Sequence, residues 1–199
     1  MKGQDNMLPS LREKEDSVAV LDNDIMEKLK IVMMQSQQFQ EMMMMYKCAI
    51  REVRTKAEVL NDEMSVRYHR NPISNITSRV KKPESIAQKL YKKSLPFTVE
   101  AIMSNLSDVA GVRIICEFID DIYSIAAMLA MQDDLKLIKI KDYIKYPKPN
   151  GYRSYHMIVA VPVHLSSGIA KVKVELQLRT TAMNSWAMLE DIVANTYSD

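Results

Sequence analysis

The chain has 199 residues, of which 47% are hydrophobic and only four are glycines, so it can form one domain with a substantial core. This composition argues against a low-complexity or disordered chain. The formal net charge of +2 is unevenly distributed. Segment 79–93 holds six basic residues and one acidic residue, and segment 139–153 holds five and one. Such blocks indicate one or more polyanionic ligands.

Neither export nor membrane insertion is predicted from the sequence. The N-terminal residues lack the apolar core of a signal peptide, and no apolar run approaches ~18 residues. Cys48 and Cys116 lie among apolar neighbours without a CxxC spacing, which is typical of buried free thiols in a reducing compartment. We therefore expect a cytoplasmic protein that does not contact a membrane.

The N-terminal third is predicted to be mainly helical. Residues 1–23 are polar and acidic without a clear period, and we expect a leader that is flexible or loosely attached. Residues 24–70 contain no Gly or Pro, and apolar residues recur in steps of three and four, as in one long helix or two with a break. Asn71-Pro72 ends this helical segment. We favour packing of its apolar stripe on the core, with a subunit contact as the alternative.

Residues 71–199 alternate between strand and helix patterns. A short edge strand is predicted at 78–82, a central apolar strand at 111–118, a half-buried strand at 135–144, and two further strands at 154–163 and 171–178. Helices are predicted at 83–94, 120–131 and 181–195, with a turn at 147–151. This order of elements predicts the α+β class, with a mixed or antiparallel sheet flanked by helices.

The last predicted strand shows the clearest alternation. Its apolar face is Val172, Val174, Leu176 and Leu178, and its polar face is Lys171, Lys173, Glu175, Gln177 and Arg179. By the same parity, Tyr152, Ser154 and His156 share a face of the preceding strand. A solvated outer face explains any single alternating strand. If the two polar faces coincide, however, one surface holds an aromatic ring, an imidazole, a carboxylate and several cations, which suggests a ligand.

Asp108 precedes the central apolar strand and Glu175 lies in the final strand. Two carboxylates from different strands can meet at one end of a sheet and hold Mg²⁺, which takes oxygen ligands and keeps waters for substrate phosphates. An Asp before a strand is more often a turn or cap residue. No GxxxxGK[ST] loop exists in the chain, so phosphates would be held by side-chain cations and the metal.

Tyr152 and His156 each have two interpretations. Tyr152 could pack in the hairpin that follows the turn, or stack on a nucleobase, an interaction worth about 1–3 kcal/mol per base in single-stranded nucleic-acid complexes. His156 could be a half-buried structural imidazole or a ligand contact, and the sequence does not separate the two.

The motifs RVKKPESI (79–86), DVAGVRI (108–114), KPNGYRSYH (148–156) and VELQLRTTAMNSWAMLE (174–190) occur in this order. They resemble the synthetase domain of RelA/SpoT-type enzymes, and specifically the small alarmone synthetases. The resemblance covers roughly residues 25–190. It implies a nucleotidyltransferase-like mixed sheet, with 71–199 as the synthetase domain. It also implies Mg²⁺-dependent transfer of pyrophosphate from ATP to the 3′-hydroxyl of GTP or GDP, which makes (p)ppGpp.

Matched by motif, Asp108 and Glu175 would be the catalytic residues that bind Mg²⁺, and Glu175 would also take the proton of the attacking hydroxyl. The implied ATP-binding residues are Arg79 and Arg113, which sandwich adenine, and Lys81 and Lys89, which hold phosphates. The implied GTP-binding residues are Tyr152, which stacks on guanine, and Lys148, Asn150 and His156. Gln177 and Arg179 match the family strand without a defined role.

The chain departs from the family pattern after Glu190. The family commonly has His there, followed by a basic-aromatic segment, whereas this chain continues with Asp191 and IVANTYSD. Small family members continue into helices that help to build a tetramer. We expect synthesis without hydrolysis. The predicted partners are ATP and GTP or GDP as substrates, further copies of the chain in a homo-oligomer, and single-stranded RNA.

Two alternatives to this function stay open. One keeps the same chemistry with another acceptor, such as the 3′ end of tRNA or an adenosine nucleotide, because lysines at 89–93 could favour a long polyanion. The other is a catalytically degenerate module that binds nucleotide or RNA. Both candidate metal carboxylates and the tyrosine are present, which favours the enzyme.

Overall fold

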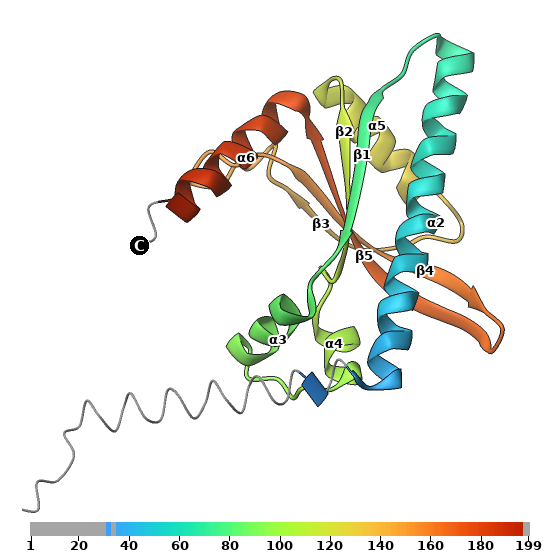
Figure 1. Cartoon of the computed structure of the whole chain (residues 1–199). Coiled ribbons are helices and arrows are strands. Elements are labelled where there is room, and N and C mark those ends of the chain that lie inside the picture. Colours follow the sequence, from blue (N-terminus) through green and yellow to red (C-terminus); the bar gives the residue numbers. More distant parts are fainter. Residues whose placement is uncertain (1–30, 33–34, 197–199) are drawn as a thin grey trace, which may run out of the picture.

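The computed structural model describes residues 31–32 and 35–196, so the predicted leader at 1–23 lies outside the described residues. Figure 1 shows the arrangement of helices and strands. The helices are α2 (Gln37–Tyr68), α3 (Pro83–Lys92), α4 (Val99–Asn105), α5 (Ile119–Ala130) and α6 (Thr181–Thr196). The strands are β1 (Ile73–Val80), β2 (Ala110–Cys116), β3 (Lys136–Asp142), β4 (Tyr155–Leu165) and β5 (Gly168–Thr180).

The five strands form one mixed sheet in the order β1-β2-β5-β4-β3. The pair β2 and β5 is parallel, and the other three pairs are antiparallel. The predicted α+β class and mixed sheet are therefore confirmed. The apolar strand β2 has a neighbour on each side, as its continuous hydrophobic sequence predicts. The predicted edge strand at 78–82 is longer than expected, since β1 begins at Ile73.

Helix α2 packs its apolar stripe on the sheet. Ser36 caps its start, because the Ser36 hydroxyl accepts a hydrogen bond from the Phe39 backbone N–H at 3.2 Å. Ile31 and Val32 are also helical, so the helical segment breaks at this cap. His69 ends the helix in the left-handed conformation at φ 52°. The buried stripe consists of Phe39, Met42, Tyr46, Ala49, Ile50, Val53, Ala57 and Leu60, which confirms core packing.

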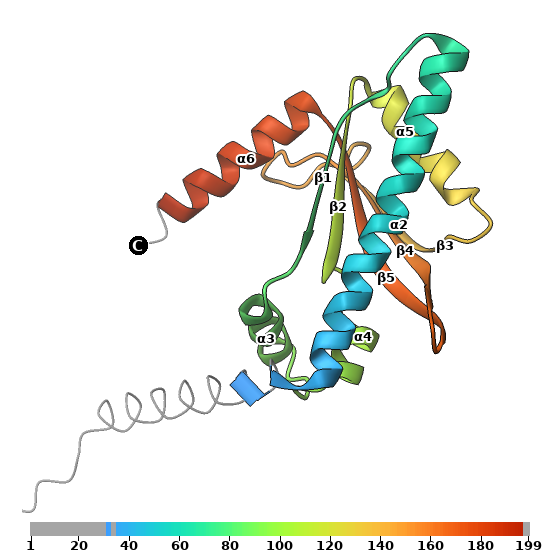
Figure 2. The same cartoon turned by 45° about the vertical axis from the view of Figure 1, so that its right-hand side comes forward.

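Helices α2 and α5 cover one face of the sheet, as the two views in Figures 1 and 2 show. The apolar side chains of β5 that were predicted to share a face are buried there. Burial of this apolar surface is the main favourable term in folding. In both figures α3 and α6 lie on the other side of the sheet, near its two ends. Lys89 of α3 and Glu190 of α6 line cavities together with polar residues of the strands.

The structure corrects two details of the predicted elements. Strand β3 is exposed on both faces and not half-buried, with Leu137, Ile138 and Ile140 exposed by 37%, 48% and 43%. It lies at the edge of the sheet, where α5 contacts only its end, through a hydrogen bond of 3.0 Å from the Tyr123 hydroxyl to the Asp142 carboxylate. Helix α4 was not predicted. Its start is capped by Thr98, whose hydroxyl accepts a hydrogen bond from the Ala101 backbone N–H at 3.2 Å.

The two cysteines are free, as predicted. Cys116 is buried, which raises the pKa of its thiol to about 12, whereas Cys48 on α2 is only half-buried and corrects the prediction of two buried thiols. Among the described helices, none combines the length and the apolar character needed to cross a membrane.

Candidate active site

Strand pairing arranges the residues on the open face of the sheet in two rows, which hold most of the predicted polar site residues of the strands. Residues directly opposite each other on neighbouring strands project to the same face. The first row, from β1 to β3, is Thr77, Arg113, Gln177, His156 and Lys141. The second row is Arg79, Gly111, Glu175, Ile158 and Lys139. The polar faces of β4 and β5 therefore coincide, as the sequence pattern required for a ligand site.

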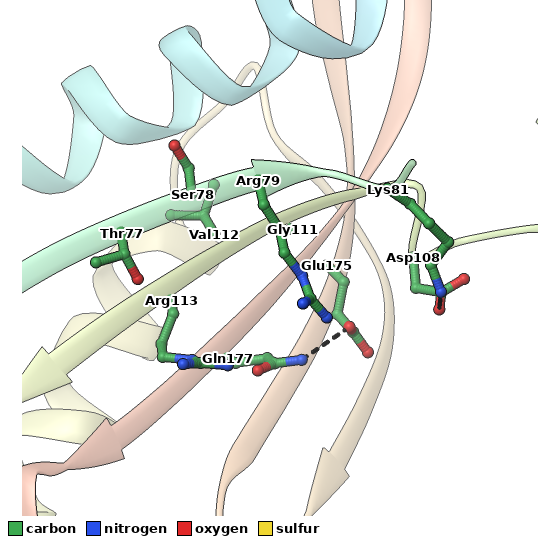
Figure 3. Close-up of a pocket in the computed structure, with 10 residues that line it drawn as sticks. All are labelled: Thr77, Ser78, Arg79, Lys81, Asp108, Gly111, Val112, Arg113, Glu175 and Gln177. Carbon is green, nitrogen blue, oxygen red and sulfur yellow. Dashed lines mark hydrogen bonds and ion pairs between the residues drawn. The ribbon is translucent and has the colours of Figure 1, made fainter. Parts of the chain in front are cut away.

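A first cavity of about 260 Å³ lies over β1, β2 and β5. Figure 3 shows that the arms of Arg79 and Arg113 extend along it, with the Glu175 carboxylate beside them. Asp108, in the loop before β2, and Lys81 line its far end. The cavity thus combines two guanidinium groups, an ammonium group and both predicted metal carboxylates.

Two lysines hold the Asp108 carboxylate. The Nζ atoms of Lys81 and Lys89 lie 2.8 Å and 2.5 Å from Asp108 Oδ2. Partial burial raises the pKa of Asp108, but the hydrogen bonds from Lys81 and Lys89 outweigh it, so the pKa lies below its usual value. Asp108 is therefore ionised at neutral pH. The two predicted phosphate ligands and the predicted metal ligand form one cluster.

A chain of hydrogen bonds orients the Glu175 carboxylate. Glu175 Oε2 accepts a hydrogen bond from the Gln177 amide at 3.0 Å, and Glu175 Oε1 lies 3.3 Å from His156 Nδ1. Partial burial raises the pKa of Glu175, but the hydrogen bonds from His156 and Gln177 outweigh it, so the pKa lies below its usual value. The Glu175 carboxylate is therefore ionised at neutral pH and can bind a cation.

The chain continues from His156 to Tyr152 and Arg179. Tyr152 Oη is 2.9 Å from His156 Nε2 and accepts a hydrogen bond from Arg179 at 2.6 Å. A carboxylate only accepts hydrogen bonds, so His156 donates from Nδ1, and in the neutral ring Nε2 accepts from the tyrosine hydroxyl. Arg179 is 4% exposed and is also bonded to Ser154 and Gln177, which fixes this end of the chain.

Two further cavities adjoin the first. The second cavity has a volume of about 360 Å³. Asp108 and Glu175 line it as well as the first cavity, and four lysines also line it. These lysines are Lys89, Lys93, Lys141 and Lys148. A third cavity of about 340 Å³ includes Arg79, Arg113 and Gln177 from the first cavity, with Lys148, Asn150, Tyr152, Arg179, Ala187 and Glu190. The three cavities form one connected polar surface.

The ring of Tyr152 lies among cations. Lys148 Nζ is 4.6 Å from the ring centroid, and the Arg179 guanidinium carbon is 5.0 Å from it. Tyr143 packs edge-on against Tyr152 with the ring centroids 6.0 Å apart. Because Arg179 is buried and Lys148 is exposed, a base that stacks on Tyr152 would displace the Lys148 side chain.

The turn before β4 is held against α6. Gly151 has φ 82°, a conformation that favours glycine, and a Cβ atom there would lie 3.4 Å from the Trp186 ring. Asn150 Oδ1 accepts a hydrogen bond from the Tyr152 backbone N–H at 3.2 Å, and Asn150 Nδ2 donates to the Glu190 carboxylate. Helix α6 therefore sets the position of the turn that carries the predicted guanine-binding residues.

All twelve residues predicted for the site line these three cavities. Among the other lining residues, those with a charged or aromatic side chain were missed as site residues: Lys93, Lys141, Tyr143 and Glu190. The two lysines belong to the basic blocks, and Lys141 lies opposite His156 in the sheet, so strand register is the signal that would have found it. Glu190 ends the last recognised motif, yet its contact with Asn150 depends on how α6 folds back.

The two carboxylates fit a divalent metal ion with few protein ligands. Asp108 and Glu175 line the same two cavities from different elements and supply only oxygen atoms. Mg²⁺ is commonly bound by one or two carboxylates together with water and substrate phosphates. Among the described residues there is no group of three or more His, Cys, Asp or Glu side chains that would form a complete protein cage.

Comparison with known proteins gives a consistent result. The family described as "Region found in RelA / SpoT proteins" matches residues 78–197. GTP pyrophosphokinase YwaC of Bacillus subtilis (strain 168) is 43% identical over 165 residues, which are 83% of this chain and 77% of YwaC. The crystal structure of small alarmone synthetase 1 from B. subtilis bound to pppGpp has a TM-score of 0.74 at 36% identity, covering 82% of both chains. Small alarmone synthetase 2 from B. subtilis has a TM-score of 0.70 at 42% identity, covering 77% of this chain and 79% of that one.

The fold and the site define a protein of the nucleotidyltransferase-like class, with a mixed sheet and a cationic surface around two carboxylates. Within this class the chain belongs to the RelA/SpoT family, and its similarity to small alarmone synthetases extends over most of its length. Pyrophosphokinases of this family typically need a divalent metal ion, which agrees with the two acidic residues at the centre of the site.

Proposed function

We propose that this protein transfers pyrophosphate from ATP to the 3′-hydroxyl of GTP or GDP and so makes (p)ppGpp with Mg²⁺. The protein is thus a GTP pyrophosphokinase, like its relative YwaC. The observation that carries this proposal is the position of Asp108 and Glu175. Both carboxylates line the first and the second cavity, and each cavity has its own set of cations.

The first cavity suits ATP. Arg79 and Arg113 provide two planar cations, which stack well on an adenine ring. Lys81 and Lys89 are within reach of phosphates that approach Asp108, because both ammonium groups already contact that carboxylate. A related structure, small alarmone synthetase 1 from Bacillus subtilis bound to AMPCPP, has a TM-score of 0.68 at 32% identity, which supports a nucleotide as ligand.

The second and third cavities suit the acceptor nucleotide. Tyr152 and Asn150 line the third cavity, where the tyrosine ring can stack on guanine. Lys148 and His156 line the second cavity together with Glu175. Gln177 and Arg179 hold Glu175 and Tyr152 in place. The structure of small alarmone synthetase 1 bound to its product pppGpp supports a guanosine nucleotide as acceptor.

The reaction needs positioning and charge neutralisation more than covalent catalysis. The acceptor 3′-oxygen attacks the β-phosphorus of ATP. The bond from that phosphorus to the oxygen that bridges it to the α-phosphorus breaks, and AMP leaves with that oxygen. Glu175 takes the proton of the hydroxyl, while His156 and Gln177 keep the carboxylate in place. The lysines and arginines neutralise the phosphates. Bound Mg²⁺, held by Asp108 and Glu175, would add a further positive charge at the transferred group.

An assay with labelled ATP and GDP tests the proposal. Asp108→Ala or Glu175→Ala should abolish transfer of the label, with thermal unfolding used to check that each variant folds. Glu117→Ala is the matched control, because this exposed carboxylate lies at the opposite end of β2 from Asp108, outside the three cavities. Wild-type rates in either site variant would rule out the metal site.

A screen with GMP, GDP, GTP, ATP and tRNA as acceptors separates this proposal from the alternatives. The homo-oligomer, the binding of single-stranded RNA, the cytoplasmic location and the division into a leader, a helical segment and a synthetase domain stay predictions.

A further inference from the structure

Lys173 connects strand β5 to the end of helix α4. Its Nζ atom donates hydrogen bonds to the backbone carbonyl oxygens of Met103 at 3.1 Å and Ser104 at 2.7 Å. The contact joins segments that are 70 and 69 positions apart in the sequence. Lys173 is half-buried and lines none of the three cavities. Direct contact with a nucleotide in those cavities therefore does not explain its position.

The last turn of α4 needs hydrogen-bond donors from outside the helix. The last four carbonyl groups of any α-helix have no partner within it. The Leu106 backbone N–H donates to the first of them, the Ile102 carbonyl oxygen, at 2.9 Å. Lys173 supplies the donors for the next two, those of Met103 and Ser104. A lysine ammonium group suits this role because it carries three N–H donors.

The two ends of this connection are close in sequence to the two candidate metal ligands. Ser104 precedes Asp108 by four residues. Lys173 precedes Glu175 by two residues, so both project from the same face of β5. Figure 3 shows that Asp108 and Glu175 approach the first cavity from these two different elements. Lys173 therefore links the segment that leads to Asp108 with the strand that carries Glu175.

Asp108 itself lies outside the paired part of the sheet. The pairing of β2 with β5 begins at Ala110 opposite Val174, two residues after Asp108. The buried side chains of Leu106 and Val109 attach this segment to the core, but apolar burial is non-directional. Hydrogen bonds, in contrast, require defined distances and angles. The two bonds from the ammonium group therefore restrict how far this segment can move relative to β5.

We infer that Lys173 is a positioning residue, which sets the separation between the Asp108 and Glu175 carboxylates by holding the end of α4 on β5. The inference rests on the proposed function, since only a metal ion shared by the two carboxylates requires one fixed separation. Mg²⁺ demands near-ideal geometry, so a shift of one ligand weakens its binding. Loss of Lys173 should therefore affect the metal ion more than the nucleotide.

Calorimetry with AMPCPP separates these two effects. In this analogue of ATP a carbon atom joins the α- and β-phosphorus atoms, so pyrophosphate cannot be transferred from it. The ratio of the Kd values in EDTA and in Mg²⁺ gives the gain in affinity that the metal ion provides. Lys173→Met removes the donors and should reduce this gain by about tenfold, as residues that orient metal ligands do. The Kd in EDTA should change by no more than about twofold, because the cations that contact the nucleotide remain.

Lys171→Met is the matched control. Lys171 is an exposed lysine on the same face of β5, and it lines none of the three cavities. This substitution removes the same charge from a solvated position, so the gain should stay within about twofold of the wild-type value. Lys173→Arg keeps N–H donors at the end of the side chain and should retain most of the gain. Thermal unfolding checks that all three variants fold.

Hydrogen exchange tests the same inference in the protein without ligands. The backbone amides of residues 105–109 should exchange faster in Lys173→Met than in the wild type or Lys171→Met, because local opening becomes easier. The amides of residues 174–178 in β5 should exchange at unchanged rates. Equal exchange of residues 105–109 in all three proteins would show that Leu106 and Val109 hold the segment alone, and would contradict the inference.

Failure of the inference differs from failure of the proposed function. If the wild-type protein transfers pyrophosphate to no acceptor, the proposed function fails, but calorimetry still measures what the metal ion contributes to binding. An equal gain from Mg²⁺ in the wild type and in Lys173→Met would overturn the inference. An equal increase of Kd in Mg²⁺ and in EDTA would also overturn it, because Lys173 would then support the nucleotide site as a whole.

Discussion

Lys89 Nζ lies 2.5 Å from Asp108 Oδ2, so a predicted phosphate ligand contacts a predicted metal ligand. Lys81 makes a second contact to the same oxygen. In the nucleotide-free protein these lysines neutralise the Asp108 carboxylate. Phosphates of ATP can attract both ammonium groups and leave Asp108 to the metal ion that accompanies the nucleotide.

Removing the charge of Lys89 should weaken the use of ATP. Lys89→Met should lower kcat/KM for ATP by about ten- to a hundredfold, the effect of one hydrogen bond to a charged group. Lys92→Met is the matched control, because Lys92 is an exposed lysine on the same helix that lines none of the three cavities. Steady-state kinetics with varied ATP provides the measurement, and equal effects of the two substitutions would contradict the assignment.

Tyr152 should act through its ring more than through its hydroxyl group. Tyr152→Ala should raise the KM for GDP by roughly 5- to 150-fold, corresponding to the loss of about 1–3 kcal/mol of stacking. Tyr152→Phe keeps the ring and loses only the hydrogen bonds to His156 and Arg179, so its KM should stay much closer to that of the wild type. If the two variants have the same KM for GDP, stacking is not the role of Tyr152.

His156 should support the chemical step by orienting Glu175. His156→Ala removes the donor 3.3 Å from Glu175 and should lower kcat by about tenfold or more, with little change in the KM for ATP. His156→Gln retains an N–H donor and should recover part of the lost kcat. An increase in the KM for GDP with unchanged kcat would instead assign His156 to acceptor binding.

The lowered pKa values of Asp108 and Glu175 predict a loss of stability in acid. A carboxyl group whose pKa is lower in the folded state contributes stability above its unfolded pKa, about 4 for Asp and Glu, and loses it as the pH falls through the folded pKa. Denaturant unfolding of the wild type and of Glu175→Gln should be compared from pH 7 downwards. The free energy of unfolding of the wild type relative to the variant should decrease below about pH 4. A pH-independent difference would contradict the lowered pKa of Glu175.

Much of the site could be predicted because strands alternate with a period of two residues. The alternation along β5 correctly placed Glu175, Gln177 and Arg179 on one face and the buried apolar residues on the other. Parity within a strand does not fix which residues of two strands meet. The contact of His156 with Glu175 depends on the register of β4 and β5, which the structure supplies.

Features that depend on distant packing could not be predicted. The exposure of β3 follows from its place at the edge of the sheet, which the alternation of Leu137 to Lys141 does not reveal. The pairing of Lys89 with Asp108 requires α3 to pack beside the loop before β2. Glu190 reaches the third cavity only because α6 lies against the turn around Gly151.

The products formed from ATP and GDP provide the most direct test of the proposed site. Phosphorus NMR of a reaction with Mg²⁺ should show AMP and a 3′-pyrophosphorylated guanosine nucleotide in equal amounts, and neither should form with EDTA or in Asp108→Ala. Formation of ADP and a monophosphorylated acceptor would contradict the transfer of pyrophosphate. Transfer that continues without a divalent ion would contradict a metal ion held by Asp108 and Glu175.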